Sequence, residues 1–121
     1  MADIRNYRDL DVWKKSMLLT NKIYDCTKLF PEDEKFGLSS QMRRAAVSIP
    51  SNIAEGSIRG TKPEFARFVD IARGSLAELE TQVILAHDRK YIRTEMYSEL
   101  IQLADDISHM LLRLLQSLRP K

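Results

Sequence analysis

The chain is poor in cysteine, glycine, proline and aromatic residues, and these shortages exclude several classes of protein. Its 121 residues include one Cys, four Gly and four Pro. A single cysteine cannot form an internal disulfide framework or a cysteine-based zinc site. All-β folds and α/β barrels need many turns, which Gly and Pro usually provide. The composition therefore favours a helical protein, and the length fits a single domain over residues 1–121.

Long hydrophobic runs are also missing. The longest apolar stretches hold only a few residues, such as Met110-Leu111-Leu112, whereas a membrane-spanning helix needs about 20. Residues 1–15 lack the apolar segment of a secretory signal peptide. We therefore expect a cytoplasmic protein that does not associate with membranes.

Apolar residues recur at helical spacing through nearly the whole chain. The pattern predicts helices over residues 9–29, 33–57, 62–88 and 94–118, with residues 1–6 as a flexible tail. Short loops between long helices are typical of antiparallel neighbours. The predicted fold is therefore all-α, an antiparallel up-down-up-down four-helix bundle.

Four residues are predicted to shape the N-termini of these helices. Asp9 and Thr94 have side chains suited to accept hydrogen bonds from the first free backbone N–H groups. Thr61 and Glu64 match a capping box, in which each side chain bonds the backbone N–H of the other residue.

Pro50 falls inside the second predicted helix. It removes the hydrogen bond to the carbonyl of Ala46 and clashes with that group. We therefore expect a kink or a local break over residues 48–52. Ser48, Ser51 and Asn52 could satisfy the freed backbone groups.

The glycines are expected to serve different purposes. Gly56 and Gly60 mark the end of the second helix and a short loop. Gly74 lies in the middle of the third helix, where glycine costs about 1 kcal/mol relative to alanine. We expect another helix to approach closely at Gly74.

The third and fourth predicted helices carry more apolar surface than a single bundle needs. The fourth has two neighbouring seams: Leu100, Leu103, Ile107, Met110 and Leu114, and Ile101, Ala104, Leu111, Leu115 and Leu118. Surplus apolar surface usually marks a protein–protein interface. The sequence therefore predicts self-association, with a monomer whose core stripe is broad as the alternative.

Residues that could carry chemistry are few. His87 and His109 do not belong to the Glu-x-x-His pairs of bundle metal sites. Cys26 lies on an apolar stripe, as a small buried hydrophobe does. There is no glycine-rich phosphate loop and no nucleophile elbow. We therefore predict a non-enzymatic protein with no catalytic, metal-binding or cofactor-binding residues.

Charge is distributed unevenly although its balance is only +2. Residues 35–73 hold seven basic and three acidic side chains, and residues 78–110 hold seven acidic and three basic ones. Such an asymmetry is typical either of solvated helix faces or of an anion-binding surface. The candidate nucleic-acid-binding residues are Arg43, Arg44, Arg59, Lys62 and Arg67.

Two further points concern the interpretation of these residues as a nucleic-acid-binding surface. Arg43 or Arg44 could instead pair within the bundle with Glu55, Glu78 or Glu80. The sequence indicates no aromatic platform interleaved with these arginines, so stacking on unpaired bases is not expected. Contacts with RNA would then be mostly with its backbone.

Residues 41–56, QMRRAAVSIPSNIAEG, resemble the signature of the bacterial four-helix-bundle family named after 23S rRNA intervening sequences, also called S23 ribosomal protein. Residues 7–14, 30–38 and 74–80, with Phe65, match further pieces, and the likeness extends over about residues 5–118. The chain departs from the family where Leu-Gly-Tyr often precedes the last helix, because it has Arg89-Lys90-Tyr91.

The resemblance implies properties that the spacing of residues does not show. Members are antiparallel bundles that assemble as ring-shaped homopentamers. Some are encoded inside insertions in 23S rRNA genes, which suggests a role connected with RNA. A similar bundle is the accessory protein of diversity-generating retroelements, which works with a reverse transcriptase and binds nucleic acid through a basic surface.

Two functional hypotheses follow. The first is a non-enzymatic homo-oligomer, expected to be a pentamer, that binds RNA or another nucleic acid through the five basic residues. The second is a protein-interaction scaffold or accessory subunit, for example of a reverse transcriptase, with little affinity of its own for nucleic acid.

Overall fold

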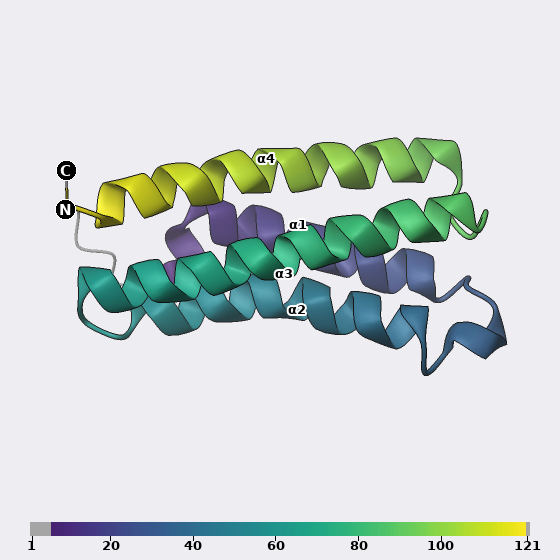
Figure 1. Cartoon of the computed structure of the whole chain (residues 1–121), viewed down its shortest axis with the longest axis horizontal. Coiled ribbons are helices and arrows are strands. Elements are labelled where there is room, and N and C mark those ends of the chain that lie inside the picture. The colour runs from purple at the N-terminus through teal and green to yellow at the C-terminus, as the bar shows by residue number, and fades with distance from the viewer. Residues whose placement is uncertain (1–5, 121) are drawn as a thin grey trace.

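Four long helices make up most of the computed structural model, which describes residues 6–120 (Figure 1). Their bounds are Asp11–Thr27 for α1, Leu38–Ser57 for α2, Lys62–Asp88 for α3 and Thr94–Leu118 for α4. Two short 3-10 helices precede α1 and α2: η1, Tyr7–Asp9, and η2, Glu32–Glu34. Residues 1–5 of the predicted tail lie outside the described residues, whereas Asn6 caps η1 by accepting from the Arg8 N–H at 2.9 Å.

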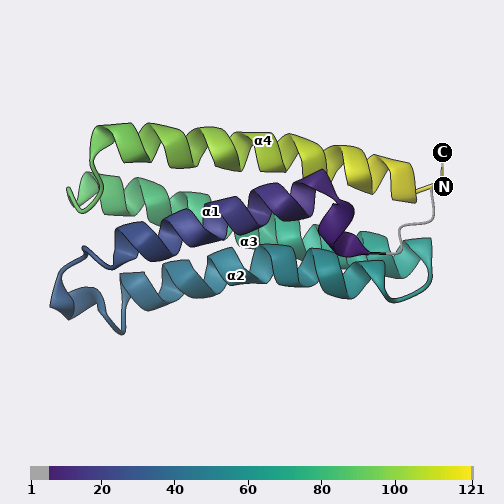
Figure 2. The same cartoon turned by 180° about the vertical axis from the view of Figure 1, so that it is seen from behind.

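Consecutive helices run antiparallel and side by side, and α1 closes the ring against α4 (Figures 1 and 2). The predicted up-down-up-down bundle is confirmed. Each helix contributes one buried stripe to a common core. The largest fully buried apolar side chains are Leu19, Ile23, Met42, Ile49, Ile53, Val69, Leu79, Leu100, Ile107, Leu111 and Leu115. Within residues 6–120, no helix is long and apolar enough to cross a membrane.

The starts of the first and second helices differ from the prediction, and the fourth begins at Thr94 as predicted but with a different cap. Asp9 ends η1 instead of capping α1, whose N-cap is Leu10. Residues 33–37 are not part of α2, because η2 and a turn precede it. The N-cap of α4 is Arg93, so Thr94 is the first helical residue and not its cap. Apolar periodicity locates a helix but does not fix its first turn.

The predicted capping box at α3 is half present. Thr61 Oγ1 accepts a hydrogen bond from the backbone N–H of Glu64 at 3.3 Å, as expected. The Glu64 carboxylate accepts from Arg67 Nε at 2.9 Å. The Glu64 carboxylate therefore bonds a residue of its own helix and does not accept from the backbone N–H of Thr61, as a full capping box requires.

Helix α2 is continuous through Pro50. Of the kink or local break expected there, the local break is therefore wrong. The Ala46 carbonyl, which loses its usual helical donor, lies 3.1 Å from Thr20 Oγ1 on α1. That hydroxyl also lies 2.8 Å from the Ser16 carbonyl and is shared between the two acceptors. Asn52 instead donates to the Ser48 carbonyl at 2.7 Å. The freed carbonyl is thus satisfied from a neighbouring helix and not by the predicted residues of α2.

The close approach between helices occurs at Gly56 and not at Gly74. A Cβ on Gly56 would lie 2.7 Å from Phe68 Cβ and 3.3 Å from the Phe65 carbonyl oxygen, both on α3. A Cβ on Gly74 would meet nothing within 4 Å, because this residue is exposed. Gly60 has φ +90° and supplies the left-handed turn of the α2–α3 loop.

The two apolar seams of α4 both face the core. Every member is buried or half-buried, and the exposed apolar side chain between them is Leu112, which is 39% exposed. The apolar surplus of this helix is therefore much smaller than its sequence suggests.

The loop between α3 and α4 keeps a glycine-type geometry without a glycine. Lys90 has φ 66°, in the left-handed region. The N–H of Tyr91 donates to the carbonyl of Ala86 at 2.9 Å, and that of Lys90 donates to His87 at 2.9 Å. These bonds form the usual glycine-terminated helix end, so the departure from Leu-Gly-Tyr leaves the turn in place.

The two glycines of opposite environment give a matched pair of variants. Gly56→Ala is expected to lower the free energy of unfolding by about 1–3 kcal/mol, because the new methyl group overlaps Phe68. Gly74→Ala is expected to raise it by about 1 kcal/mol through helix propensity alone. Urea denaturation followed by circular dichroism measures both, and a stabilising Gly56→Ala would contradict the described packing.

A second variant tests the loop. Lys90→Gly is expected to raise the free energy of unfolding by about 1 kcal/mol, because glycine adopts positive φ without the Cβ clash. Arg89→Gly, at φ −78°, is the control and is expected to give no gain. Equal effects of the two substitutions in thermal denaturation would count against the left-handed geometry of Lys90.

Candidate functional site

The five predicted basic residues fall at two separate places. Arg43 and Arg44 lie near the start of α2, whereas Arg59 and Lys62 flank the loop that follows it, with Arg67 in the second turn of α3. From Arg44 to the end of α2 at Ser57 the helix rises by about 20 Å, and Arg59 lies beyond that end. The structure therefore divides the predicted site into a groove at one end of the bundle and a corner at the other.

At the corner, most of the positive charge is matched by carboxylates. The Arg59 and Arg67 guanidinium carbons lie 4.9 and 4.6 Å from the centroid of the Phe68 ring. Arg59 also pairs with Glu55 at 2.6 Å, and Arg67 with Glu64 at 2.9 Å. The hydrogen bond and charge of Arg67 lower the pKa of Glu64. Two of the three corner cations are thus matched by carboxylates that are three or four residues away in the sequence, and Lys62 is exposed beside them.

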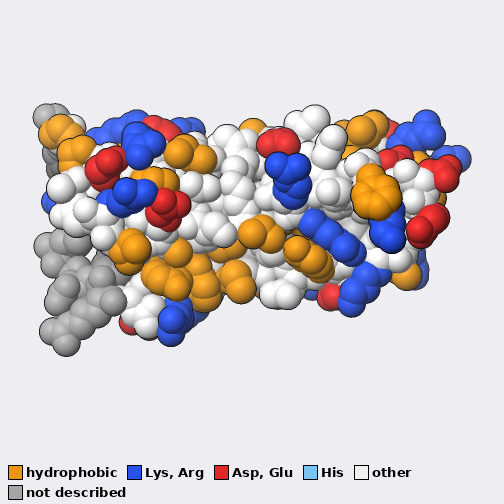
Figure 3. Space-filling model, turned by 90° about the horizontal axis from the view of Figure 1, so that it is seen from below, with side chains coloured by type: hydrophobic (Ala, Val, Ile, Leu, Met, Phe, Trp, Pro, Cys, Tyr) orange, Lys and Arg blue, Asp and Glu red, His pale blue; other side chains and the backbone are white. Residues whose placement is uncertain are grey.

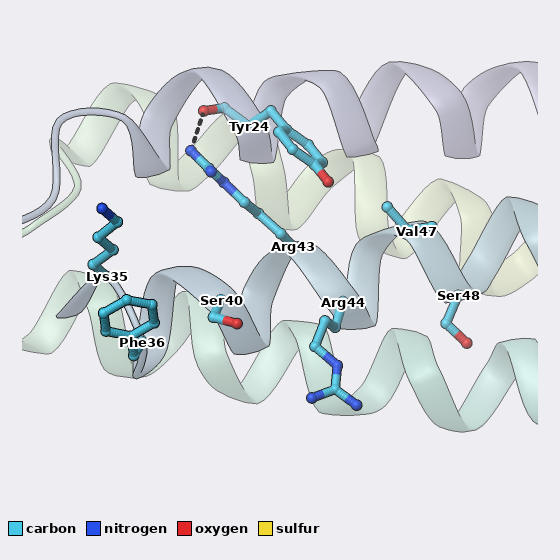
Figure 4. A pocket seen from close by; sticks show the side chains of 8 residues that line it. All are labelled: Tyr24, Lys35, Phe36, Ser40, Arg43, Arg44, Val47 and Ser48. Carbon is cyan, nitrogen blue, oxygen red and sulfur yellow. Dashed lines mark hydrogen bonds between the residues drawn. The ribbon is translucent and has the colours of Figure 1, made fainter.

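The other end carries a groove of about 630 Å³ along α1 and the start of α2, the α1–α2 groove (Figure 4). Its lining residues are Tyr24, Lys35, Phe36, Ser40, Arg43, Arg44, Val47 and Ser48. Figure 4 shows Arg43 reaching across to α1, while Arg44 extends from the other side of α2. Figure 3 shows Lys and Arg side chains gathered over this end of the α2 face, next to an apolar area.

Arg43 is held by neutral groups. Its Nε donates to Thr27 Oγ1 at 2.8 Å, and Nη2 donates to the Tyr24 carbonyl at 3.4 Å. Its guanidinium carbon lies 4.8 Å from the centroid of the Tyr24 ring. These contacts fix the direction of the side chain without cancelling its charge, so Arg43 presents an ordered cation to the groove.

Arg44 does not form the predicted internal ion pair. Among the described residues no carboxylate pairs with it, and its side chain is exposed. Glu55 pairs with Arg59. Glu78 lies in the neighbouring α2–α3 groove with Arg44, yet it accepts from Gln82 Nε2 at 3.2 Å. Burial and then the charge of Asp105 raise the pKa of Glu80.

The acidic stretch of the sequence is directed at α1 instead. Lys15 on α1 pairs with Asp106 on α4 at 3.5 Å, and Lys22 pairs with Glu99 on the same two helices. The acids of α4 thus meet lysines of α1, across the bundle from the arginines. Through this partition the basic surface of α2 keeps its positive charge.

Sequence reasoning missed Phe36. This ring is 89% exposed, lies in the groove beside the arginines and has Lys35 Nζ at 5.6 Å from its centroid. The expectation that no aromatic side chain accompanies the arginines is therefore wrong. Phe36 was assigned to a helix in the prediction, whereas the turn after η2 places it at the groove.

The turn that carries Phe36 is held by Glu34. One carboxylate oxygen of Glu34 accepts from the backbone N–H of Leu38 at 3.0 Å, which caps α2. The other accepts from the hydroxyl of Tyr91, in the α3–α4 loop, at 3.0 Å. The segment before α2 is thus tied both to its own helix and to the adjacent loop.

The remaining candidate groups offer no reactive site in the described part of the chain. Cys26 is 8% exposed, and burial raises the pKa of its thiol to about 11, so the thiol stays protonated at neutral pH. The predicted role of Cys26 as a small buried hydrophobe is confirmed. Asp106 pairs with Lys15, and His109 Nδ1 lies 2.9 Å from the Asp105 carbonyl. Within residues 6–120, no three His, Cys, Asp or Glu side chains are grouped to hold a metal ion.

The fold and the groove define a small helical-bundle protein with a basic surface at one end. Residues 8–113 match the family model described as 23S rRNA-intervening sequence protein. The chain belongs to that family, which confirms the resemblance seen in residues 41–56.

A solved structure agrees. The chain is similar to a crystal structure from Bacteroides thetaiotaomicron VPI-5482, described as a protein of unknown function from the S23 ribosomal protein family. The TM-score is 0.80 at 26% identity, and the alignment covers 87% of this chain and 98% of the other. Among curated proteins, none matches the chain.

Proposed function

We propose that the protein binds RNA or another nucleic acid without catalysing a reaction, and that the α1–α2 groove makes the main contacts with phosphate. The observation that supports this most directly is that Arg43 and Arg44 carry charge that no described carboxylate neutralises. Of the acids that could have done so, Glu55 pairs with Arg59 and Glu78 accepts a hydrogen bond from Gln82. The name of the family is consistent with a role connected with RNA.

The geometry suits phosphate. A guanidinium presents several N–H donors in a planar fork and binds phosphate oxygens through charge-assisted hydrogen bonds. Arg43 is already ordered by Thr27 and Tyr24, so it loses little side-chain freedom on binding. Ser40 adds a hydroxyl to the same groove.

The corner residues play a smaller part in this proposal. Arg59 and Arg67 would have to exchange a carboxylate for a phosphate, and an exchange of equal partners adds little affinity. Lys62 adds one exposed cation near them. The corner therefore extends the electrostatic surface at the far end of α2.

Self-association completes the proposal, with a pentamer as the expected assembly. Ile71 and Leu85 on α3 are 41% and 48% exposed, and their spacing of fourteen residues places them on one side of the helix. An assembly would present several copies of the basic groove, which raises avidity without new contacts.

The second candidate is an accessory subunit that binds a protein partner, such as a reverse transcriptase. The exposed apolar side chains of α3 favour it, because they could contact a different protein as well as another copy. Capture of a protein partner that survives nuclease treatment, with no RNA binding by the purified protein, would favour this candidate over the first.

Reversing the charge of the groove tests nucleic-acid binding. The double variant Arg43→Glu/Arg44→Glu is expected to lower affinity for RNA by about 100-fold or more, because two charge-assisted hydrogen bonds to phosphate are lost. The wild-type affinity is expected to fall steeply with salt. Fluorescence anisotropy with labelled RNA measures both, with circular dichroism as the check on folding.

A charge-matched control separates the groove from net charge. Arg73→Glu/Arg113→Glu changes two exposed arginines on α3 and α4 that do not line the groove. This variant is expected to retain most of the affinity. If both double variants lose affinity equally, or if neither does, the groove is not the binding surface.

Light scattering coupled to gel filtration tests the assembly. The expected mass is that of a pentamer of the 14.0 kDa chain. Ile71→Glu/Leu85→Glu is expected to shift the protein towards smaller species, since it places charges on the proposed contact face. A wild-type monomer at micromolar concentration would contradict the proposal.

A further inference from the structure

The exposed ring of Phe36 is the feature of the groove that phosphate binding does not use. We propose that the α1–α2 groove takes unpaired nucleotides, one of whose bases stacks on Phe36 while Arg43 and Arg44 hold the adjoining phosphates. The protein is then selective for single-stranded nucleic acid over duplex. This inference rests on the proposed function and adds the class of nucleic acid to it.

The position of Phe36 sets it apart from the other aromatic side chain of the groove. The Tyr24 ring already has the Arg43 guanidinium near its face, 4.8 Å from its centroid. Phe36 is 89% exposed and has Lys35 as its cationic neighbour, 5.6 Å from the ring centroid. Figure 4 shows Phe36 and Lys35 together at one end of the groove. Phe36 is therefore the more accessible of the two aromatic side chains in the groove, because Tyr24 is only 38% exposed.

The support beneath the ring is ordered, as a stacking platform requires. Glu34 bonds the backbone N–H of Leu38 and the hydroxyl of Tyr91, both at 3.0 Å. Lys35 N–H donates to the Glu32 carbonyl at 3.1 Å, and Gly37 N–H donates to Glu34 at 3.0 Å. The backbone on both sides of Phe36 is thus hydrogen-bonded, so little backbone freedom is lost when a base stacks on the ring.

The combination of residues matches the chemistry of an unpaired nucleotide. Proteins bind single strands with cations that follow the backbone and with aromatic rings on which bases stack. In a duplex the faces of the bases are covered by their neighbours, so an exposed ring gains nothing there. Phosphate binding by the arginines alone would not distinguish single strands from duplex, whereas stacking on Phe36 does.

The substitution Phe36→Ala tests the inference on the full-length protein. Removing one stacking partner is expected to weaken binding of a labelled oligouridine about tenfold, with affinity for an RNA duplex of equal length unchanged. Phe36→Tyr is expected to restore the oligouridine affinity. Leu29→Ala is the matched control, because Leu29 is 84% exposed in the same connection but does not line the groove.

The outcomes separate this inference from the proposed function. If Phe36→Ala leaves oligouridine affinity unchanged, or lowers oligouridine and duplex affinity equally, stacking on Phe36 is overturned. The proposed function still stands in that case, provided that Arg43→Glu/Arg44→Glu abolishes binding of both RNAs. If the wild-type protein binds neither RNA, the proposed function fails and the inference fails with it.

Discussion

The structure depends on the continuity of α2, which runs the length of the bundle although it contains Pro50. Pro50 leaves the Ala46 carbonyl without a helical donor, and Thr20 on α1 supplies the hydrogen bond at 3.1 Å. Because α2 does not end there, one helix carries both the groove residues Arg43 and Arg44 and the tight contact at Gly56. The same hydrogen bond fixes α1 against α2, and these two helices form the walls of the groove.

The second organising constraint is the partition of charge. Lys15 and Lys22 of α1 pair with Asp106 and Glu99 of α4. Among the described residues, no carboxylate pairs with the arginines of α2. Exposed pairs such as those between α1 and α4 contribute little to stability, typically below about 1 kcal/mol each. Their importance here lies in where they leave the remaining charge, since a weak net charge of +2 becomes a positive surface at one end of the bundle.

Much of the fold could be predicted from the sequence, because core burial imposes a periodicity that the residues record directly. The candidate site could be predicted only in part. The sequence showed that Arg43 and Arg44 are adjacent. Their distance from Arg59 depends on the length of α2, and the absence of an ion pair at Arg44 depends on which helices become its neighbours. Phe36 was assigned to a helix because apolar spacing does not distinguish a first turn from the loop before it. The close helix contact was predicted at Gly74 for a related reason. The lower helix propensity of glycine can be read from the sequence, whereas close packing depends on which residues of another helix lie opposite.

The carboxylate of Glu34 has a consequence for how the two loops at this end behave. It joins the turn before α2 to the α3–α4 loop through Tyr91, fifty-seven residues away in the sequence. The position of the turn at the end of the groove therefore depends in part on the α3–α4 loop, although Tyr91 does not line the groove. Related chains with a different α3–α4 loop would then carry the same basic residues in a groove of different shape. A substitution in that loop would thus change which ligands the groove accepts.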